Sequence, residues 1–461
     1  MSALKITSAR TLAAAVLQKF NPKKDYASDL LNKHIDKLNS TAEKQRATDL
    51  VYGCLRNLSA IDHCVTTLAD CPTERIQSRI LSILRPAVYE LLYCPQTADY
   101  AIVNESVETA KQTAGKKQTA FVNAVLRQIT RHIKNRNAEL KRANPQKIIP
   151  QNEHSGCLFD VDILPDTKTQ ITDYLHLAFS LPKWLIESWL AAYGHDSTRS
   201  ICFACNRRPR LWLRPNTLKT SPEKFAETLA KNNIQYQFSE DNTMLQVKHP
   251  SSVTTLPGFY KGEFTIQDIS AIHAVNLLNP GQDRRILDLC AAPGTKTTHL
   301  AEHTHDKAEI IATDISAERL KLVEQNTKRL GISSVTIISY EKVEKEPCNL
   351  GLFDSILLDV PCSNTGVLSK RIEVRFRITP DAVTKITNTQ LQLLETAVKC
   401  LKPNGKICYS TCSIQPDENK KLIEKFLDSH TDFKLETEKL TLPSAETPDR
   451  DGGYVAIIKR S

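Results

Sequence analysis

The spacing of apolar residues along the chain changes from a helical period to a strand period. Over the first third, apolar residues return every three or four positions, which places them on one face of a helix. The clearest stretches of this kind are 9–17, 46–56, 80–92, 102–111 and 119–127. The pattern predicts an all-helical domain over residues 1–140.

The helical period fades in the next forty residues. Residues 141–178 are polar, and cations gather at the start of this segment and just before it. These cations are Arg131, Lys134, Arg136, Lys141, Arg142 and Lys147. A charged run is typical of a solvated segment, and it also suits contact with phosphates. We therefore predict a basic and polar linker over 141–178.

Order returns with an amphipathic helix over 181–190, which has Pro182 near its first turn. Residues 210–217 alternate as a strand does, a helix opens at 221–225, and 234–247 alternates again. This mixture predicts a small α+β subdomain over residues 179–258.

The last part of the chain, residues 259–461, reads as a repeated strand-and-helix pattern. Apolar runs end near Leu289, Thr313, Ile338, Leu358 and Ser410, with helical stretches between them, and 451–458 looks like a closing hairpin. Buried strands alternating with helices predict a doubly wound α/β core.

Composition narrows the class of protein. A net charge of +9 over 461 residues is modest and permits a polyanionic partner. There is no secretory leader and no apolar run long enough to span a membrane, so we expect a cytoplasmic, monomeric protein with no membrane contact. Cys202 and Cys205 have metal-ligand spacing, but no second pair or histidine cluster completes a zinc site. We expect no metal there and assign both thiols to helix packing.

The first candidate site is the loop Cys290-Ala291-Ala292-Pro293-Gly294-Thr295-Lys296, which joins a predicted strand to a predicted helix. Ligands bind at such loops because backbone N–H groups and a helix N-terminus converge there. A second strand ends in Asp314, twenty positions after Gly294, which suits a carboxylate that holds ribose hydroxyls. The loop lacks both G-K-[ST] and G-x-G-x-x-G. A nucleoside without a pyrophosphate fits best, and S-adenosylmethionine is the common one.

Two cysteines follow two later strands. Residues 353–358 run into Asp359-Val360-Pro361-Cys362, and residues 405–410 run into Thr411-Cys412. Parallel strands release the chain at one edge of a sheet, so both thiols are expected at the ligand edge. A lone cysteine is more often a buried thiol, but two at neighbouring strand ends favour a catalytic function.

These motifs resemble the RNA cytosine-5 methyltransferases of the Sun/Fmu superfamily, over most of the chain. The helical domain is similar to the NusB-like domain of the bacterial members that act on small-subunit ribosomal RNA. The resemblance implies a Rossmann-like S-adenosylmethionine-dependent methyltransferase core, an RNA-binding N-terminal domain and a small-subunit ribosomal RNA partner rather than DNA. From the residues alone, a packed scaffold explains the N-terminal helices equally well.

The resemblance also implies residue roles. The Cys412 thiolate would attack carbon 6 of cytosine, Cys362 would assist removal of the carbon-5 proton, and Asp359 would hydrogen-bond the base and lie near the cofactor. Residues 290–296 would enclose the methionine end of the cofactor. Asp314 would bind the ribose, and Arg319 would lie over the adenosine. In the small subdomain, Arg214 and Asn216 are candidate RNA contacts.

The chain departs from the family pattern at three places. Thr295 replaces a second glycine, although a β-branched residue tolerates positive φ badly. Either Tyr340 or Glu341 replaces the aspartate that binds adenine. The basic, proline-containing run after Leu368 has become 369–377, which keeps the charge but not the register. These departures leave an alternative open: a catalytically decayed methyltransferase fold that acts as an RNA-binding or ribosome-assembly factor. The sequence does not identify the modified cytosine, nor whether free RNA or an assembling subunit is the substrate.

Overall fold

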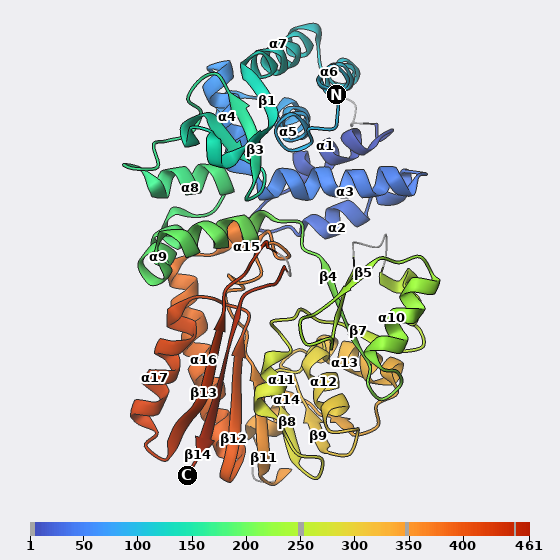
Figure 1. The fold of residues 1–461 in the computed structure, drawn as a ribbon, viewed down its shortest axis with the longest axis vertical. Coiled ribbons are helices and arrows are strands. Elements are labelled where there is room, and N and C mark those ends of the chain that lie inside the picture. Colours follow the sequence, from blue (N-terminus) through green and yellow to red (C-terminus); the bar gives the residue numbers. More distant parts are fainter. Residues whose placement is uncertain (1–4, 248–252, 346–349, 447–448) are drawn as a thin grey trace. The chain divides into compact units, whose positions relative to one another are not determined.

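The chain packs into two units that do not follow its linear order. A computed structural model describes residues 5–247, 253–345, 350–446 and 449–461. Unit 1 comprises Met1–Arg207 and Leu368–Arg377, and unit 2 comprises Arg208–Val367 and Ile378–Ser461. Each unit is treated by itself below (Figure 1).

Unit 1 begins as a bundle of helices, as the apolar period predicted. The helices are α1 Ala9–Lys19, α2 Ala27–Asn32, α3 Thr41–Arg56, α4 Leu58–Ala69, α5 Ser78–Tyr93, α6 Asp99–Thr113 and α7 Lys116–His132. Ser8 caps α1 by accepting the Thr11 amide, and α5 is buried along most of its length. The all-helical prediction for this part is confirmed.

The predicted linker is folded. Strands β1 Ile133–Glu139, β2 Ile148–Pro150 and β3 Ser155–Phe159 form an antiparallel sheet in the order β1-β3-β2. Ile148, Ile149 and Cys157 are fully buried. The prediction of a linker over 141–178 was wrong because these strands are too short, and too interrupted by polar residues, to show a period in the sequence.

Arg136, one of the predicted solvated cations, has a structural role in this sheet. Its guanidinium donates to the carbonyls of Glu90 at 2.6 Å, Leu91 at 2.8 Å and Cys94 at 2.7 Å. These carbonyls belong to the end of α5, where the last turn of a helix leaves acceptors without partners. Arg136 therefore satisfies the C-terminus of α5 and is not available to a phosphate.

Unit 1 is completed by α8 Ile171–Phe179, α9 Lys183–Asn206 and the segment 368–377, which contains α15 Val374–Arg377. Helix α9 begins within the predicted subdomain 179–258, but it packs in this unit and is interrupted at Gly194, where φ is 75°. Arg375 is buried and donates to the carbonyls of Arg56, Phe179 and Cys205. The basic run 369–377 thus supplies an internal anchor of unit 1.

Unit 2 begins with a small antiparallel sheet in the order β5-β6-β4-β7. It contains β4 Leu211–Pro215, α10 Pro222–Lys231, β5 Tyr236–Phe238, β6 Leu245–Val247 and β7 Phe264–Ile266. Leu213, Phe225 and Phe264 form its core with neighbouring apolar residues. This is the α+β subdomain that the alternation predicted, without the helix at 181–190.

The two RNA contacts proposed for this subdomain are internal. Arg214 is 5% exposed and forms an ion pair with Glu302 at 2.8 Å. Asn216 is fully buried and donates to the carbonyls of Gly262 and Leu330. Both side chains fix the small sheet to the larger fold, so the expectation that they contact RNA was wrong.

The rest of unit 2 is the predicted doubly wound sheet, in the order β10-β9-β8-β11-β12-β14-β13. Strands β8 to β12 are parallel, and β14 is antiparallel to both of its neighbours. The strands are β8 Arg285–Asp288, β9 Glu309–Ala312, β10 Val335–Ile337, β11 Phe353–Asp359, β12 Leu401–Thr411, β13 Phe433–Thr441 and β14 Gly453–Arg460.

Helices cover both faces of this sheet. They are α11 His273–Leu278, α12 Thr295–His303, α13 Ala317–Leu330, α14 Tyr340–Lys345, α16 Pro380–Cys400 and α17 Lys420–Ser429. Helices α16 and α17 pack on one apolar face, while α11 and α12 pack on the other (Figure 1). Thr379 caps α16 by accepting the Ala382 amide.

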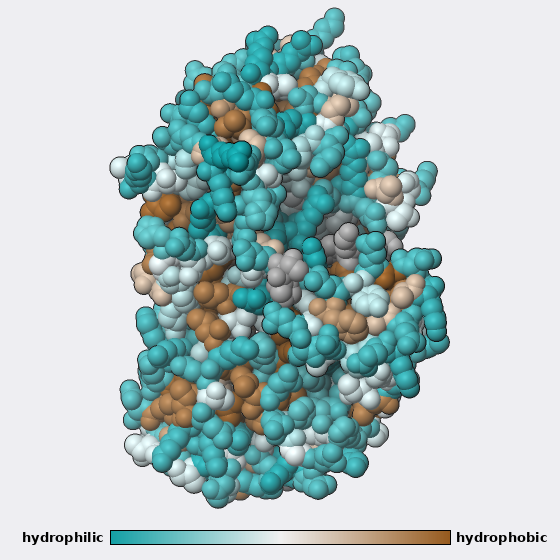
Figure 2. Space-filling model, in the orientation of Figure 1, coloured by the Kyte–Doolittle hydropathy of each residue, from teal (hydrophilic) through white to brown (hydrophobic). Residues whose placement is uncertain are grey.

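The surface is mainly polar on the face drawn in Figure 2, with apolar residues between the polar ones. Within the described part of the chain, no helix combines the length and apolar character needed to cross a membrane.

Candidate active site

The site lies where the order of the parallel strands reverses. Strand β8 lies between β9 and β11 in the sheet. The chain passes from β8 to β9 on one side, whereas β11 pairs with β8 on the other. The loops that follow β8 and β11 therefore diverge and leave a crevice. The loop after β8 enters α12 at Thr295. Gly294 has a φ of 97°, and a Cβ there would lie 3.1 Å from the Cα of Val323. Gly294 alone makes the left-handed turn, which explains why Thr295, the first helical residue, replaces a glycine without strain.

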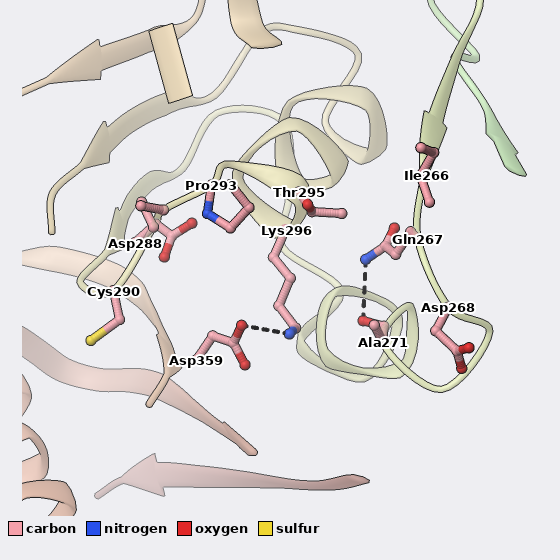
Figure 3. Close-up of a pocket in the computed structure, with 12 residues that line it drawn as sticks. Ile266, Gln267, Asp268, Ala271, Asp288, Cys290, Pro293, Thr295, Lys296 and Asp359 are labelled. Atoms are coloured by element: carbon pink, nitrogen blue, oxygen red, sulfur yellow. Dashed lines mark hydrogen bonds and ion pairs between the residues drawn. The ribbon is translucent and has the colours of Figure 1, made fainter. Parts of the chain in front are cut away.

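A cavity of about 230 Å³ opens at this crevice (Figure 3). Its walls include every residue of the predicted 290–296 loop except Gly294, together with Asp288 and Asp359. Burial raises the pKa of the Cys290 thiol, so this sulfur stays protonated and serves as wall rather than nucleophile.

Lys296 and Asp359 form an ion pair at 2.7 Å across the cavity (Figure 3). Burial works to lower the pKa of Lys296, but the Asp359 carboxylate outweighs it and the pKa is raised. Ser410, the residue of β12 opposite Asp359, donates to the same carboxylate at 2.9 Å. The predicted residues Lys296 and Asp359 are therefore brought together at the ends of different elements.

Asp288 is a site residue that the sequence did not reveal. It is 1% exposed, and one carboxylate oxygen accepts the Thr297 hydroxyl at 2.7 Å. The other oxygen is buried without a hydrogen-bond partner among the described residues. Burial raises the pKa of Asp288 to about 7, and the Asp359 charge acts in the same direction. The sequence shows an acid inside an apolar run, directly before a small-residue loop, but this pattern does not reveal where its carboxylate points.

Asp314 lies at the carboxyl end of β9, as predicted, and is 5% exposed. Its carboxylate accepts the amides of Ala292 at 3.1 Å and Ser316 at 3.0 Å. Arg319 donates to the Ala292 carbonyl at 2.6 Å, and its guanidinium lies 3.6 Å from Asp314. Both residues thus hold the loop at the cavity.

The two candidates for the adenine contact differ in exposure. Tyr340 packs against the same apolar cluster as Cys290. Glu341 is 77% exposed at its side chain and pairs with Lys345 one turn along α14. Tyr340 is the better placed of the two, and its contact with adenine stays a prediction.

The two predicted cysteines meet. The sulfurs of Cys362 and Cys412 are 3.1 Å apart, and the Cys412 thiol donates to the Asn364 side chain at 3.2 Å. The hydrogen bond with Cys412, followed by burial, raises the pKa of Cys362. Gly366 allows this approach: a Cβ there would lie 2.8 Å from the Cys412 carbonyl oxygen.

The other cysteine pair, Cys202 and Cys205, is buried in α9. No group of three or more potential metal ligands occurs among the residues that the structure describes. The packing interpretation of this pair agrees with its burial.

Comparison with known proteins identifies the family. Models of three families match: 16S rRNA methyltransferase RsmB/F over residues 275–453, the NusB family over 7–131, and the RsmF/B-like ferredoxin-like domain over 181–254. The probable ribosomal RNA small subunit methyltransferase B of Synechocystis sp. is 32% identical over 98% of this chain and 96% of its own length. The chain belongs to the RsmB/F family.

Two further comparisons agree with this membership. The probable ribosomal RNA small subunit methyltransferase B of Bacillus subtilis is 30% identical over 99% of this chain and 96% of its own. A crystal structure of a methyltransferase homologue from Pyrococcus horikoshii is 26% identical, with a TM-score of 0.53 over 62% of this chain and 98% of its own. The structure titled PH0851 has a TM-score of 0.73 over the full length of both chains, at 24% identity, and supports the fold.

The RsmB/F family uses S-adenosylmethionine, and the cavity suits this cofactor. The ammonium group of S-adenosylmethionine needs hydrogen-bond acceptors, and Asp288 offers a buried carboxylate oxygen that has no donor among the described residues. The carboxylate of Asp314 stands at the second strand end, where ribose hydroxyls are bound in folds of this kind. The residues present therefore fit the group.

Proposed function

We propose that this protein transfers a methyl group from S-adenosylmethionine to carbon 5 of a cytosine in small-subunit ribosomal RNA, through a covalent bond between Cys412 and the RNA. The observation that carries the proposal is the meeting of the two sulfurs, 3.1 Å apart, where β11 and β12 release the chain. The names of the relatives support the RNA substrate.

The chemistry explains why the site holds two thiols. Carbon 5 of cytosine is a weak nucleophile. When the Cys412 thiolate bonds to carbon 6, the ring becomes an enamine whose carbon 5 can attack a methyl group. The cofactor supplies that methyl group as a sulfonium. Loss of the carbon-5 proton then expels the Cys412 thiolate and restores the aromatic ring.

The raised pKa of Cys362 supports this division of roles. A raised pKa keeps Cys362 protonated at the start, which disfavours it as the nucleophile of the pair. The first cause of the raised pKa is the Cys412 sulfur itself, and burial is the second. In the proposed sequence, Cys362 gives up its own proton to solvent before it takes the proton from carbon 5.

Asp359 links the two halves of the proposed reaction. The Lys296 ammonium and the Ser410 hydroxyl fix its carboxylate between the cavity and the end of β12. From there it would accept a hydrogen bond from the amino group of the cytosine and so orient the base for attack on carbon 6.

The two cysteines provide the decisive experiment. Cys412→Ala should give neither methylated RNA nor a covalent adduct, while Cys362→Ala should methylate and then stall. The stalled species should survive denaturing electrophoresis and disappear on ribonuclease treatment. Cys71→Ala, at a partly exposed cysteine of unit 1, is the matched control and should behave as the wild type.

The outcomes separate the alternatives. An adduct with Cys412→Ala and none with Cys362→Ala would reverse the two roles, as in enzymes that use the Pro-Cys thiol as nucleophile. Methylation by both variants would refute the site. A wild-type protein that fails to bind S-adenosylmethionine would favour the non-enzymatic assembly factor. Bisulfite sequencing of small-subunit RNA, with and without the protein, would identify the cytosine.

A further inference from the structure

A buried carboxylate lies behind the two cysteines. Glu418 ends the short helical turn Pro416–Glu418 between β12 and α17, and its side chain is fully buried. One carboxylate oxygen accepts the Ser363 amide at 2.8 Å and the Gln390 side chain at 3.1 Å. The other accepts the Ser413 hydroxyl at 2.7 Å and also the Ser363 hydroxyl.

Three of these four donors come from the two loops that carry the thiols. Ser363 directly follows Cys362, and Ser413 directly follows Cys412. Gln390, from α16, also donates to the carbonyl of Pro361 at 3.0 Å, on the other side of Cys362. One carboxylate therefore joins the two loops from behind.

The backbone of Glu418 is fixed as well. The Tyr409 hydroxyl donates to its carbonyl at 2.6 Å. The next residue, Asn419, accepts from Thr411 at 2.7 Å and donates to the Ser413 carbonyl at 2.9 Å. The backbone at Glu418 is thus held to β12 and to the loop of Cys412, and the Glu418 carboxylate also contacts the loop of Cys362.

Stability alone does not account for this arrangement. A buried carboxylate loses its hydration, and the four donors that hold it are neutral groups, which repay only part of that cost. Well-packed apolar residues often serve a core better than buried charges do. A carboxylate offers something else: two acceptor oxygens in a fixed plane, which can hold two separate loops at once.

We propose that Glu418 is a positioning residue that sets the distance and orientation of the Cys362 and Cys412 thiols relative to each other. This inference deepens the proposed function and rests on it. Cys412 must reach carbon 6 on one side of the base while Cys362 waits near carbon 5, and a shift of about 1 Å in such a geometry can cost on the order of 100-fold in rate.

The test is Glu418→Gln, which keeps the size of the side chain but leaves a single acceptor oxygen. Its amide nitrogen would face donors that need an acceptor. We expect the single-turnover rate of covalent adduct formation to fall at least tenfold. The affinity for S-adenosylmethionine and the KM for RNA should stay within twofold, because the cavity residues are held by other contacts. A defect in overall folding would instead lower both affinities together with the rate.

Two further variants complete the design. Glu424→Gln removes the same charge from an exposed position on α17 and should react as the wild type does. Ser413→Ala removes one of the four hydrogen bonds to the carboxylate, together with the contacts of the Ser413 hydroxyl with Ser363, Thr365 and Gln415, and should slow adduct formation several-fold. Because Ser413 acts through Glu418, the double variant should be no slower than Glu418→Gln alone. If Glu418→Gln fails to fold, Ser413→Ala decides.

Adduct formation at the wild-type rate by Glu418→Gln, or by Ser413→Ala where it decides, would overturn the inference and leave the proposed function standing. A wild-type protein that forms no adduct through Cys412 would instead remove the proposed function, and this inference with it.

Discussion

Two neighbouring regions of unit 2 differ in the charge of the side chains that form them. The cofactor edge, which we define as Asp288, Lys296, Asp314 and Asp359, is held together mainly by charges. The thiol edge, which we define as Cys362, Ser363, Cys412, Ser413 and Glu418, contains one carboxylate among neutral groups. Both edges lie at the carboxyl ends of parallel strands in one sheet: the cofactor edge follows β8, β9 and β11, and the thiol edge follows β11 and β12.

The difference follows from what each edge must hold. S-adenosylmethionine carries two positive groups and must bind and leave at every turnover, so fixed carboxylates suit it. The thiols are part of the chain, and the rate of the proposed reaction depends on their positions relative to the base. The cofactor edge is therefore expected to govern affinity, and the thiol edge to govern rate.

The largest effect should come from Asp359, which belongs to the cofactor edge and accepts a hydrogen bond from Ser410, two residues before Cys412. Asp359→Asn removes the charge that pairs with Lys296 and weakens the acceptor for Ser410. We expect the single-turnover methylation rate to fall by at least about 100-fold, the size seen when one preorganised polar group is lost from a site. RNA affinity, measured by filter binding, should stay near the wild-type value. A rate within tenfold of the wild type would mean that Asp359 belongs to the cofactor edge alone.

Asp314 tests the cofactor edge by itself. Asp314→Ala should weaken S-adenosylmethionine binding by at least about tenfold, because a carboxylate on two ribose hydroxyls is charge-assisted and hard to replace. Tyr340→Ala should weaken it less, and Glu318→Gln, in the exposed first turn of α13, should leave it unchanged. Calorimetry would measure all three. Equal affinity for Asp314→Ala and the wild type would contradict the ribose assignment.

The smallest effect concerns pH. The pKa of Asp288 is raised to about 7 by burial, so this carboxyl is protonated below that pH in the folded protein. Its contribution to the stability of the cofactor-free protein is present at low pH and is lost as pH rises from about 4 through about 7. Cofactor affinity should change in the opposite sense, because only the ionised form attracts an ammonium group.

We therefore expect the affinity for S-adenosylmethionine to rise several-fold between pH 6 and pH 8, roughly one unit on each side of the Asp288 pKa. Asp288→Asn should bind more weakly at pH 8 and show a flatter profile over the same range. An unchanged profile in the variant would assign the dependence to another group.

Sequence reasoning succeeded where a functional residue follows a strand directly. The order of the chain alone places Asp314, Asp359, Cys362 and Cys412 at one edge of a parallel sheet, once the strands are recognised. It failed for Glu418, whose partner Ser363 is 55 positions away. It also failed for Asp288, because an acid inside an apolar run gives no sign of whether its carboxylate faces a cavity.

Charge was the least informative pattern. Arg136 and Arg214 lie in segments that suggested RNA contact, and Arg375 lies in a basic run, yet each donates to carbonyls or carboxylates within its own unit. A sequence shows that a guanidinium is present but does not show its acceptors. Every residue has a backbone carbonyl, so no residue type marks the carbonyls at the end of a helix as acceptors.

The place of Arg375 in unit 1 has a consequence for the order of synthesis. A growing chain releases its N-terminus first, and Cys205, whose carbonyl Arg375 binds, is made 170 residues before that arginine. At translation rates of about 5–20 residues per second, the interval is roughly 10 to 35 s. Unit 1 therefore leaves the ribosome early but receives its last anchor only after most of the parallel strands of unit 2 have been made. During that interval the helices of unit 1 lack the contacts of Arg375, and they are a substrate for a chaperone that protects nascent chains.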